Sequence, residues 1–271
     1  MTINLLGVDF TSAPRKKKPI TCAWGALHAR VLTLSGFEMC ESFESHIELL
    51  SRDGAWIGGF DMPFGLPREF VAEQGWPSAW MGYTKAALAL SRIELVQRCR
   101  AYAAARPAGQ KLAYRATDKP ARSSSAMWWM NPPVVLMYHA GVRCLLEAKV
   151  RIEPCRRVAS ERIAVEAYPG LLQKRFGIGS YKQDIAAKQT AEKRENRGRF
   201  LLKIAENAPQ VFGFSCKVTR AATKAMMDDA SGDTLDAYVC LLQAGYAAVR
   251  RDAGFGFPKS VPANEGWIVM A

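Results

Sequence analysis

The chain has 271 residues, of which 49% are hydrophobic and 23% charged, with a formal net charge of +12. These proportions are typical of a folded globular protein and exclude general disorder. No run approaches the roughly 18 consecutive apolar residues of a transmembrane helix, and the N-terminal segment lacks the pattern of a secretory signal. We therefore expect a cytoplasmic protein with no membrane partner.

The positive charge favours a polyanionic partner, because Lys and Arg side chains neutralise phosphates and release their counterions. Basic residues are spread along the chain, with some concentration at residues 15–18, 92–122 and 174–203. This pattern predicts a nucleic acid, DNA or RNA, as the partner. An ordinary basic surface is the alternative.

The cysteines and histidines form no metal-binding motif in the sequence. Seven cysteines and three histidines are scattered through the chain. Structural zinc sites use closely spaced Cys and His ligands. We therefore expect no zinc, and we expect reduced, mostly buried thiols.

The first third of the chain predicts four strands and one helix. In order, these are strands at residues 3–10, 20–34 and 37–43, a helix at 44–52 and a strand at 56–60. The long second strand is rich in β-branched and aromatic residues, and Gly36 separates it from the third. Residues 15–18 are expected in the hairpin between the first two strands.

The middle of the chain predicts a helical insertion. Helical spacing covers residues 83–106 and 134–149, and a polar basic loop at 112–125 lies between them. With no repeat or low-complexity linker in the sequence, we expect a single domain, 1–271, with a helical cap at about 62–160.

The last third returns to strands and helices in alternation. A strand at residues 162–165 ends on Glu166, and helices are expected at 170–176, 185–207 and 217–228. The final helix, 233–250, has apolar residues along one face and two acids, Asp233 and Asp236, in its first turn. The chain is therefore predicted to be an α/β protein.

Acidic residues recur where elements begin or end. Asp9, Asp61 and Glu166 each follow an apolar strand, and Asp236 lies at a helix start. Sites in open α/β sheets form at the carboxyl ends of strands. Converging carboxylates repel one another unless a cation neutralises them, and Mg²⁺ or Mn²⁺ prefers carboxylate oxygen. The pattern predicts a divalent metal site.

Each acid also has a structural interpretation. Asp61, before Met62 and Pro63, is compatible with a local turn. Asp233 is a candidate helix N-cap, with Asp236 interacting with the helix dipole. Glu166 is also a candidate ion-pair partner for one of the many arginines. The four acids together favour the metal site over these separate explanations.

Six short motifs carry a family resemblance. In chain order they are GVDF, FDMPFGLP, AVEAYPG, GSYK, DTLDAYVCLLQA and the closing EGWI. With this order and spacing, the chain resembles the DUF429 family of predicted nucleases with a ribonuclease-H-like fold. The resemblance implies a mixed five-stranded sheet, antiparallel in its first three strands and flanked by helices.

The resemblance also implies roles for the acids. In the wider superfamily, which includes junction resolvases, such acids bind Mg²⁺ or Mn²⁺ for phosphodiester hydrolysis. Asp9 would bridge the metal ions, Asp61 and Glu166 would be further ligands, and Asp236 would complete the catalytic site. The pair Asp233 and Asp236 is similar to the double acid of the resolvases, which makes Asp233 a further candidate metal ligand.

Basic residues near these motifs are candidate phosphate-binding groups. They are Lys182, directly after Tyr181, and Arg115, Lys119 and Arg122 in the polar loop. A solvated surface charge is the alternative for each.

Three functions follow from the sequence. The first is a metal-dependent nuclease that hydrolyses phosphodiester bonds of DNA or RNA. The second is a non-catalytic nucleic-acid-binding protein of the same fold. The third is an actin-like ATPase or kinase, in which the loop Asp9-Phe10-Thr11-Ser12 would bind phosphate. That loop lacks glycine and no Gly-rich adenosine motif follows, so no nucleotide cofactor is expected.

Overall fold

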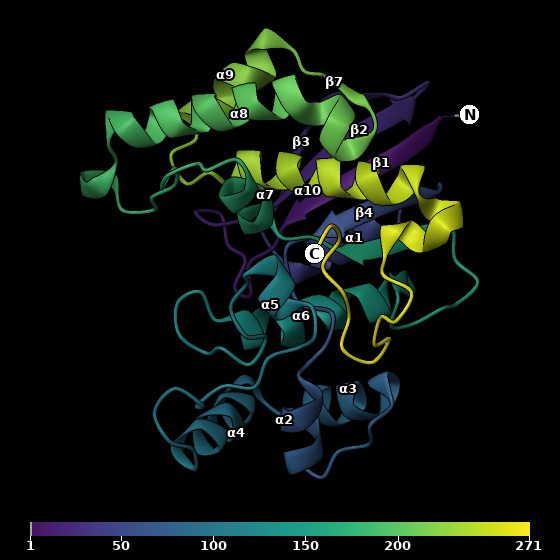
Figure 1. The fold of residues 1–271 in the computed structure, drawn as a ribbon, viewed down its shortest axis with the longest axis vertical. Coiled ribbons are helices and arrows are strands. Elements are labelled where there is room, and N and C mark those ends of the chain that lie inside the picture. Colours follow the sequence, from purple (N-terminus) through teal and green to yellow (C-terminus); the bar gives the residue numbers. More distant parts are fainter. Residues whose placement is uncertain (1) are drawn as a thin grey trace.

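The computed structural model describes residues 2–271 and contains a mixed seven-stranded sheet (Figure 1). The order across the sheet is β5-β6-β4-β1-β2-β3-β7. The strands are β1 (Ile3–Asp9), β2 (Ile20–His28), β3 (Val31–Cys40), β4 (Trp56–Phe60), β5 (Arg151–Glu153), β6 (Arg162–Glu166) and β7 (Ser215–Lys217). The expected α/β class, with the first three strands antiparallel, is confirmed.

The expected count of five strands is wrong. The two additional strands, β5 and β7, have three residues each and lie at the two edges of the sheet. Both pair in parallel with a longer neighbour, β6 and β3 respectively. Three residues are too few to show a strand period in the sequence, so only the pairing reveals them.

The boundary between β2 and β3 also differs from the prediction. The turn lies at Ala29 and Arg30, both with positive φ, whereas Gly36 lies inside β3. Two-residue hairpin turns with positive φ usually contain Asn or Gly. Ala-Arg carries no such signal, and the predicted second strand therefore ran through the turn into the first residues of β3.

Ten α-helices are assigned in the described part of the chain. They are α1 (Phe43–Ser51), α2 (Arg68–Glu73), α3 (Trp80–Ala89), α4 (Arg92–Ala104), α5 (Asp118–Ala121), α6 (Val134–Glu147), α7 (Pro169–Arg175), α8 (Ala191–Phe212), α9 (Arg220–Asp228) and α10 (Asp233–Val249). The helix expected at 83–106 is two helices. Ser91 and Glu94 form a capping box that begins α4 and separates it from α3.

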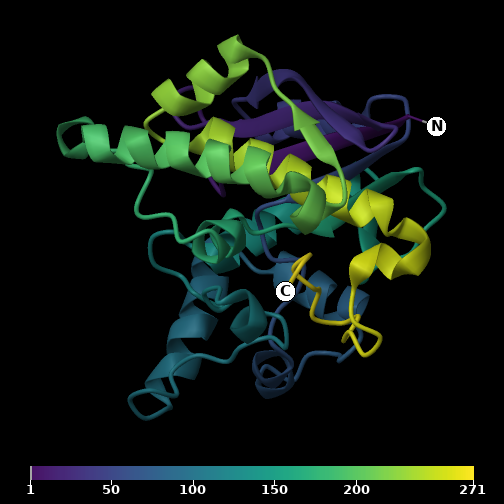
Figure 2. The same cartoon turned by 45° about the horizontal axis from the view of Figure 1, so that its top comes forward.

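The helices cover both faces of the sheet (Figure 2). Helix α10 packs on β1, β2 and β4, and α8 lies over α10. On the other face, α1 contacts β3 and α6. The helices α2 to α4 extend away from the sheet at the lower end in Figure 1. Their buried side chains Phe70 and Tyr102 belong to the same apolar cluster as Val8 and Phe60 of the sheet.

Two glycines let α10 lie directly on the sheet. A Cβ atom on Gly7 would lie 2.1 Å from the carbonyl oxygen of Ala237, and one on Gly59 would lie 2.3 Å from that of Cys240. Both contacts are far inside van der Waals distance, and both involve helix backbone. Only glycine permits this approach at the two positions. The approach fixes where the first turn of α10 meets the sheet.

Candidate metal centre

Asp9 and Asp61 reach the same face of the sheet because β1 and β4 run in parallel. In that register Val8 lies opposite Phe60, and the backbone N–H of Asp61 donates to the carbonyl oxygen of Val8 at 2.9 Å. Side chains alternate along a strand. Asp9 and Asp61, which follow Val8 and Phe60, therefore point away from those two side chains and towards α10.

Asp236 joins these two acids from the first turn of α10. Because the helix rests on Gly7 and Gly59, its N-terminal end lies against the ends of β1 and β4. Carboxylate oxygens of Asp9, Asp61 and Asp236 lie within 4.8 Å of one another. We call these three residues the carboxylate triad.

Two neighbouring side chains hold Asp236 in place. The hydroxyl of Tyr181 and the ammonium group of Lys182 both donate to its carboxylate. Asp236 and Tyr181 are buried, while the side chain of Lys182 is 51% exposed. Lys182 thus places a positive charge at the triad from the solvent side.

Two acids of the triad, Asp9 and Asp61, have raised pKa values. The pKa of Asp9 lies well above its ordinary value, first because the group is buried and then because Asp233 and Asp236 carry like charge. Burial also raises the pKa of Asp61 to about 7, although Lys182 acts in the opposite direction. A bound cation would relieve both effects, since it favours the ionised carboxylates.

The donor set fits a hard divalent ion. All three donor atoms are carboxylate oxygens, the ligands that Mg²⁺ and Mn²⁺ prefer. The three groups belong to three different elements, so the fold and not the local sequence brings them together. Asp9, Asp61 and Asp236 are therefore the residues that would hold such an ion.

Glu166 lies next to the triad but is not part of it. In the pairing of β4 with β6, Glu166 lies opposite Phe60, which is the residue before Asp61. Its side chain therefore points to the opposite face. There its oxygens accept from Arg115 at 2.7 and 2.8 Å and from the backbone N–H of Phe64 at 3.0 Å. The alternative of an arginine partner for Glu166 is the arrangement observed.

Arg115 has no N–H group left for a phosphate. Its five N–H groups donate to the carboxylates of Glu166 and Asp118 and to the carbonyl oxygen of Glu265. Its side chain is 2% exposed, and Asp118 and Glu166 are equally buried. Arg115 therefore ties the polar loop to the end of β6.

Asp233 lies beside the triad and has a cationic partner of its own. The ammonium group of Lys18 donates to Asp233 and to Asp184, at 3.1 Å in both cases. Asp233 is not the N-cap of α10, which is Gly232. The side chain of Asp229 instead accepts from the first turn of the helix.

Asp9 and Asp61 of the triad line a cleft of about 670 Å³. Its lining also includes Glu166, Lys182 and Asp233. A neighbouring pocket of about 440 Å³ shares Lys18 and Asp233 with the cleft and is also lined by Arg15 and Lys17. Lys119 and Arg122, the other two candidate phosphate-binding residues, are exposed side chains that do not line either cavity.

Two residues of this site were missed as site residues from the sequence. The sequence places Lys18 in a hairpin and Tyr181 in the motif GSYK, and neither position marks a site residue by itself. Lys18 belongs to an isolated bridge with Arg15 that folds the loop between β1 and β2 over the cleft. The basic run at residues 15–18, next to a strand that ends on an acid, was the available signal.

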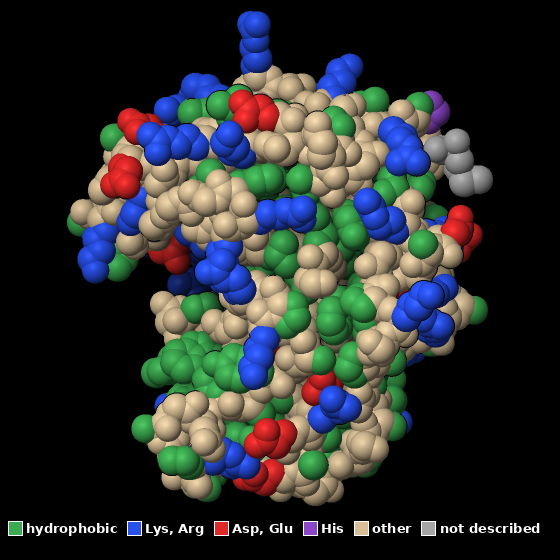
Figure 3. Space-filling model, viewed as in Figure 1, with side chains coloured by type: hydrophobic (Ala, Val, Ile, Leu, Met, Phe, Trp, Pro, Cys, Tyr) green, Lys and Arg blue, Asp and Glu red, His purple; other side chains and the backbone are tan. Residues whose placement is uncertain are grey.

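The charge of the surface does not by itself locate a binding site. On the face shown in Figure 3, Lys and Arg side chains are spread over the upper and lower parts and do not gather in one patch.

None of the helices described in residues 2–271 is long and apolar enough to cross a membrane.

Comparison with known proteins identifies the family. Neither the search of curated proteins nor the search of solved structures found a match. The family model described as "Protein of unknown function (DUF429)" matches residues 7–264, which include the whole carboxylate triad and the loop of Lys182. The chain therefore belongs to the DUF429 family.

Proposed function

We propose that the protein is a Mg²⁺- or Mn²⁺-dependent nuclease that hydrolyses phosphodiester bonds of DNA or RNA. One observation carries the proposal: carboxylates from β1, the end of β4 and the start of α10 meet within 4.8 Å at a cleft. Acids held this close repel one another unless a cation offsets their charge. A role in binding a divalent ion explains why they are held together.

A ribonuclease-H-like fold is part of the same proposal. It is supported by the antiparallel run β1-β2-β3, the helix α1 that follows, and the return of β4 in parallel beside β1. The position of Asp9 at the end of the central strand agrees with that assignment.

The chain's own residues have distinct tasks in this proposal. Asp9, Asp61 and Asp236 hold the ion, and Tyr181 orients Asp236 by its hydrogen bond. A bound Mg²⁺ or Mn²⁺ supplies positive charge to phosphate oxygens and activates water for hydrolysis. Lys182 offsets the negative charge of the triad and lies where it can contact a phosphate oxygen of the substrate.

The surroundings of the triad support a polyanionic substrate longer than one nucleotide. The cleft shares Lys18 with the neighbouring pocket, which Arg15 and Lys17 also line. Basic groups along such a path would contact successive phosphates of a strand. This arrangement supports a nucleic acid over a small phosphate ester.

The direct test is cleavage of labelled single-stranded, duplex and branched DNA and RNA with Mg²⁺ or Mn²⁺. Wild type should cleave at least one substrate, and Asp9→Asn should abolish cleavage. Asp252→Asn is the matched control, because Asp252 is exposed and follows the opposite end of α10. No cleavage by wild type on any substrate, or equal cleavage by Asp9→Asn, refutes the proposal.

The second candidate is a non-catalytic nucleic-acid-binding protein. The observation that favours it is that Lys182 and Lys18 already pair with Asp236 and Asp233. In that case the acids would fix the two lysines and not a metal ion. Salt-sensitive binding of nucleic acid, unchanged by EDTA and by Asp9→Asn, would support this candidate over the nuclease.

A further inference from the structure

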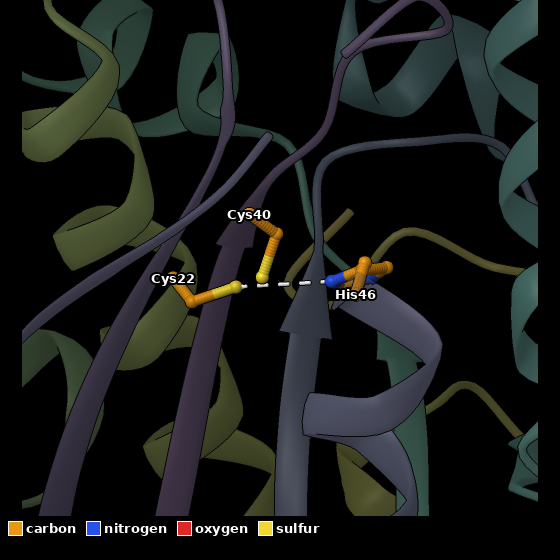
Figure 4. Close-up of side chains that lie close together, drawn as sticks. All are labelled: Cys22, Cys40 and His46. Carbon is orange, nitrogen blue, oxygen red and sulfur yellow. Dashed lines mark hydrogen bonds between the residues drawn. The ribbon is translucent and has the colours of Figure 1, made fainter. Parts of the chain in front are cut away.

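A second cluster of possible ligands lies on the face of the sheet opposite α10. It consists of Cys22 on β2, Cys40 at the end of β3 and His46 on α1. Figure 4 shows both sulfur atoms close to the imidazole ring. One donor atom from each residue lies within 4.8 Å of the other two. We call these residues the sulfur–imidazole cluster.

The fold brings the cluster together from positions that are separated in the sequence. In the β2–β3 pairing, Ile20 lies opposite Cys40 and Cys22 lies opposite Glu38. The two cysteines are thus diagonal neighbours on one face of the hairpin. Helix α1 begins three residues after β3 ends and returns His46 over that face. The three residues therefore form a site only in the folded chain.

The spacing of the donor atoms fits a single metal ion. With metal–sulfur bonds of about 2.3 Å and metal–nitrogen bonds of about 2.0 Å, two donors of one tetrahedral ion lie about 3.5–3.8 Å apart. Sγ of Cys22 lies 3.9 Å from Nδ1 of His46. The other two separations between donor atoms are at most 4.8 Å, so each pair has to close by no more than about 1 Å to coordinate one ion.

A disulfide between the cysteines fits less well. Diagonal neighbours on antiparallel strands are about 7–8 Å apart between Cα atoms, whereas a disulfide requires a separation below about 7 Å. At this typical diagonal separation a disulfide would be strained, whereas an ion between the sulfur atoms and the imidazole spans a longer distance than an S–S bond.

The donor chemistry selects the kind of ion. Two thiolates and an imidazole are ligands for soft or borderline cations such as Cu⁺ and Zn²⁺, and not for Mg²⁺. All three side chains are buried, with exposed fractions of 0%, 2% and 1% for Cys22, Cys40 and His46.

We propose that Cys22, Cys40 and His46 bind one thiophilic ion, Zn²⁺ or Cu⁺, which fastens α1 to the β2–β3 hairpin. The ion is taken up as the chain folds, because the folded cluster is closed to solvent. The site also packs against one wall of the cleft. Phe10 follows Asp9 and lines the cleft, and the centroid of its ring lies 6.0 Å from that of His46.

The test is metal retention after refolding. Reduced wild-type protein is refolded from denaturant with Zn²⁺, with Cu⁺ under anaerobic conditions, or with Mg²⁺ alone, desalted, and analysed for bound metal. About one Zn²⁺ or Cu⁺ per chain should remain, and the arm that retains metal identifies the ion. Cys22→Ser and His46→Ala should lose it. Cys144→Ser, a buried cysteine outside the cluster, should retain it.

Two further measurements keep the proposal falsifiable if the variants do not fold. Wild type refolded with Co²⁺ should show thiolate-to-cobalt charge-transfer absorption, and its melting temperature should rise when Zn²⁺ or Cu⁺ is retained. No retained metal in any wild-type preparation overturns the proposal. So does equal retention by Cys22→Ser, or a Cys22–Cys40 disulfide in protein that takes up no metal when reduced.

Discussion

Replacing Gly7 by alanine should lift α10 from the sheet. The new Cβ would lie 2.1 Å from the carbonyl oxygen of Ala237 and 2.3 Å from the backbone nitrogen of Leu241. An ordinary contact begins at 3.4 Å, so the helix backbone has to move by about 1.3 Å. Overpacking of a core costs roughly 1–3 kcal/mol. Because neither clashing atom belongs to a flexible side chain, we expect a loss of about 3 kcal/mol.

The same movement should disturb the carboxylate triad. Asp236 lies one residue before Ala237, so it moves with the helix backbone. A displacement of about 1 Å at a catalytic group can cost roughly 100-fold in rate. Gly7→Ala should therefore reduce both stability and any Mn²⁺-dependent cleavage, although it changes no ionisable group.

Urea unfolding of wild type, Gly7→Ala and Gly36→Ala measures the effect on stability. Gly36 is the matched control, because it also lies in a strand and a Cβ there meets nothing within 4 Å. Its replacement should change the free energy of unfolding by no more than about 1 kcal/mol. Titration with Mn²⁺ by calorimetry reports on the triad. Equal stability of the two variants would refute the proposed contact between α10 and β1.

Three further predictions concern the charges of the site. In protein stripped of divalent ions, the free energy of unfolding should fall as the pH rises from about 4 to about 7, because folded Asp61 retains a proton that the unfolded chain has released. Asp61→Asn should flatten this slope in urea titrations at several pH values, and an unchanged slope would contradict the assignment. Lys182→Met should bind Mn²⁺ more tightly by calorimetry, because it removes a cation that competes for Asp236, yet should cleave more slowly; Lys119→Met, an exposed control, should do neither. Arg115→Met should lower the free energy of unfolding by about 3–5 kcal/mol, since it leaves two buried carboxylates without their partner; a loss no larger than that of exposed Arg122→Met would count against this role.

The sequence predicted the elements that have a clear period or a clear boundary. The apolar run that ends on Asp9, the short strand before Asp61 and the helix that begins at Asp233 all lie where the pattern indicated. The boundary at Ala29 and Arg30 was missed, because neither residue is typical of a turn with positive φ.

The choice among the acids required the register of the sheet. Sequence position alone made Glu166 equivalent to Asp9 and Asp61, because each follows an apolar strand. In the pairing of β4 with β6, Glu166 lies opposite Phe60 and not opposite Asp61. A difference of one residue along a strand reverses the face to which the side chain points. On that face Glu166 meets Arg115. In the sequence Arg115 is only one of many basic residues, and the structure shows that it is the buried partner of Glu166.

The family, the α/β class and the acids at the ends of β1 and β4 could be predicted from the sequence, because apolar periodicity and short motifs are local properties. Which side chains meet depends on the tertiary structure. The close approach of α10 at Gly7 and Gly59 brings Asp236 to Asp9 and Asp61, and the β2–β3 hairpin brings Cys22 and Cys40 to His46. Both clusters depend on strand register and helix packing, which join residues that no local pattern connects.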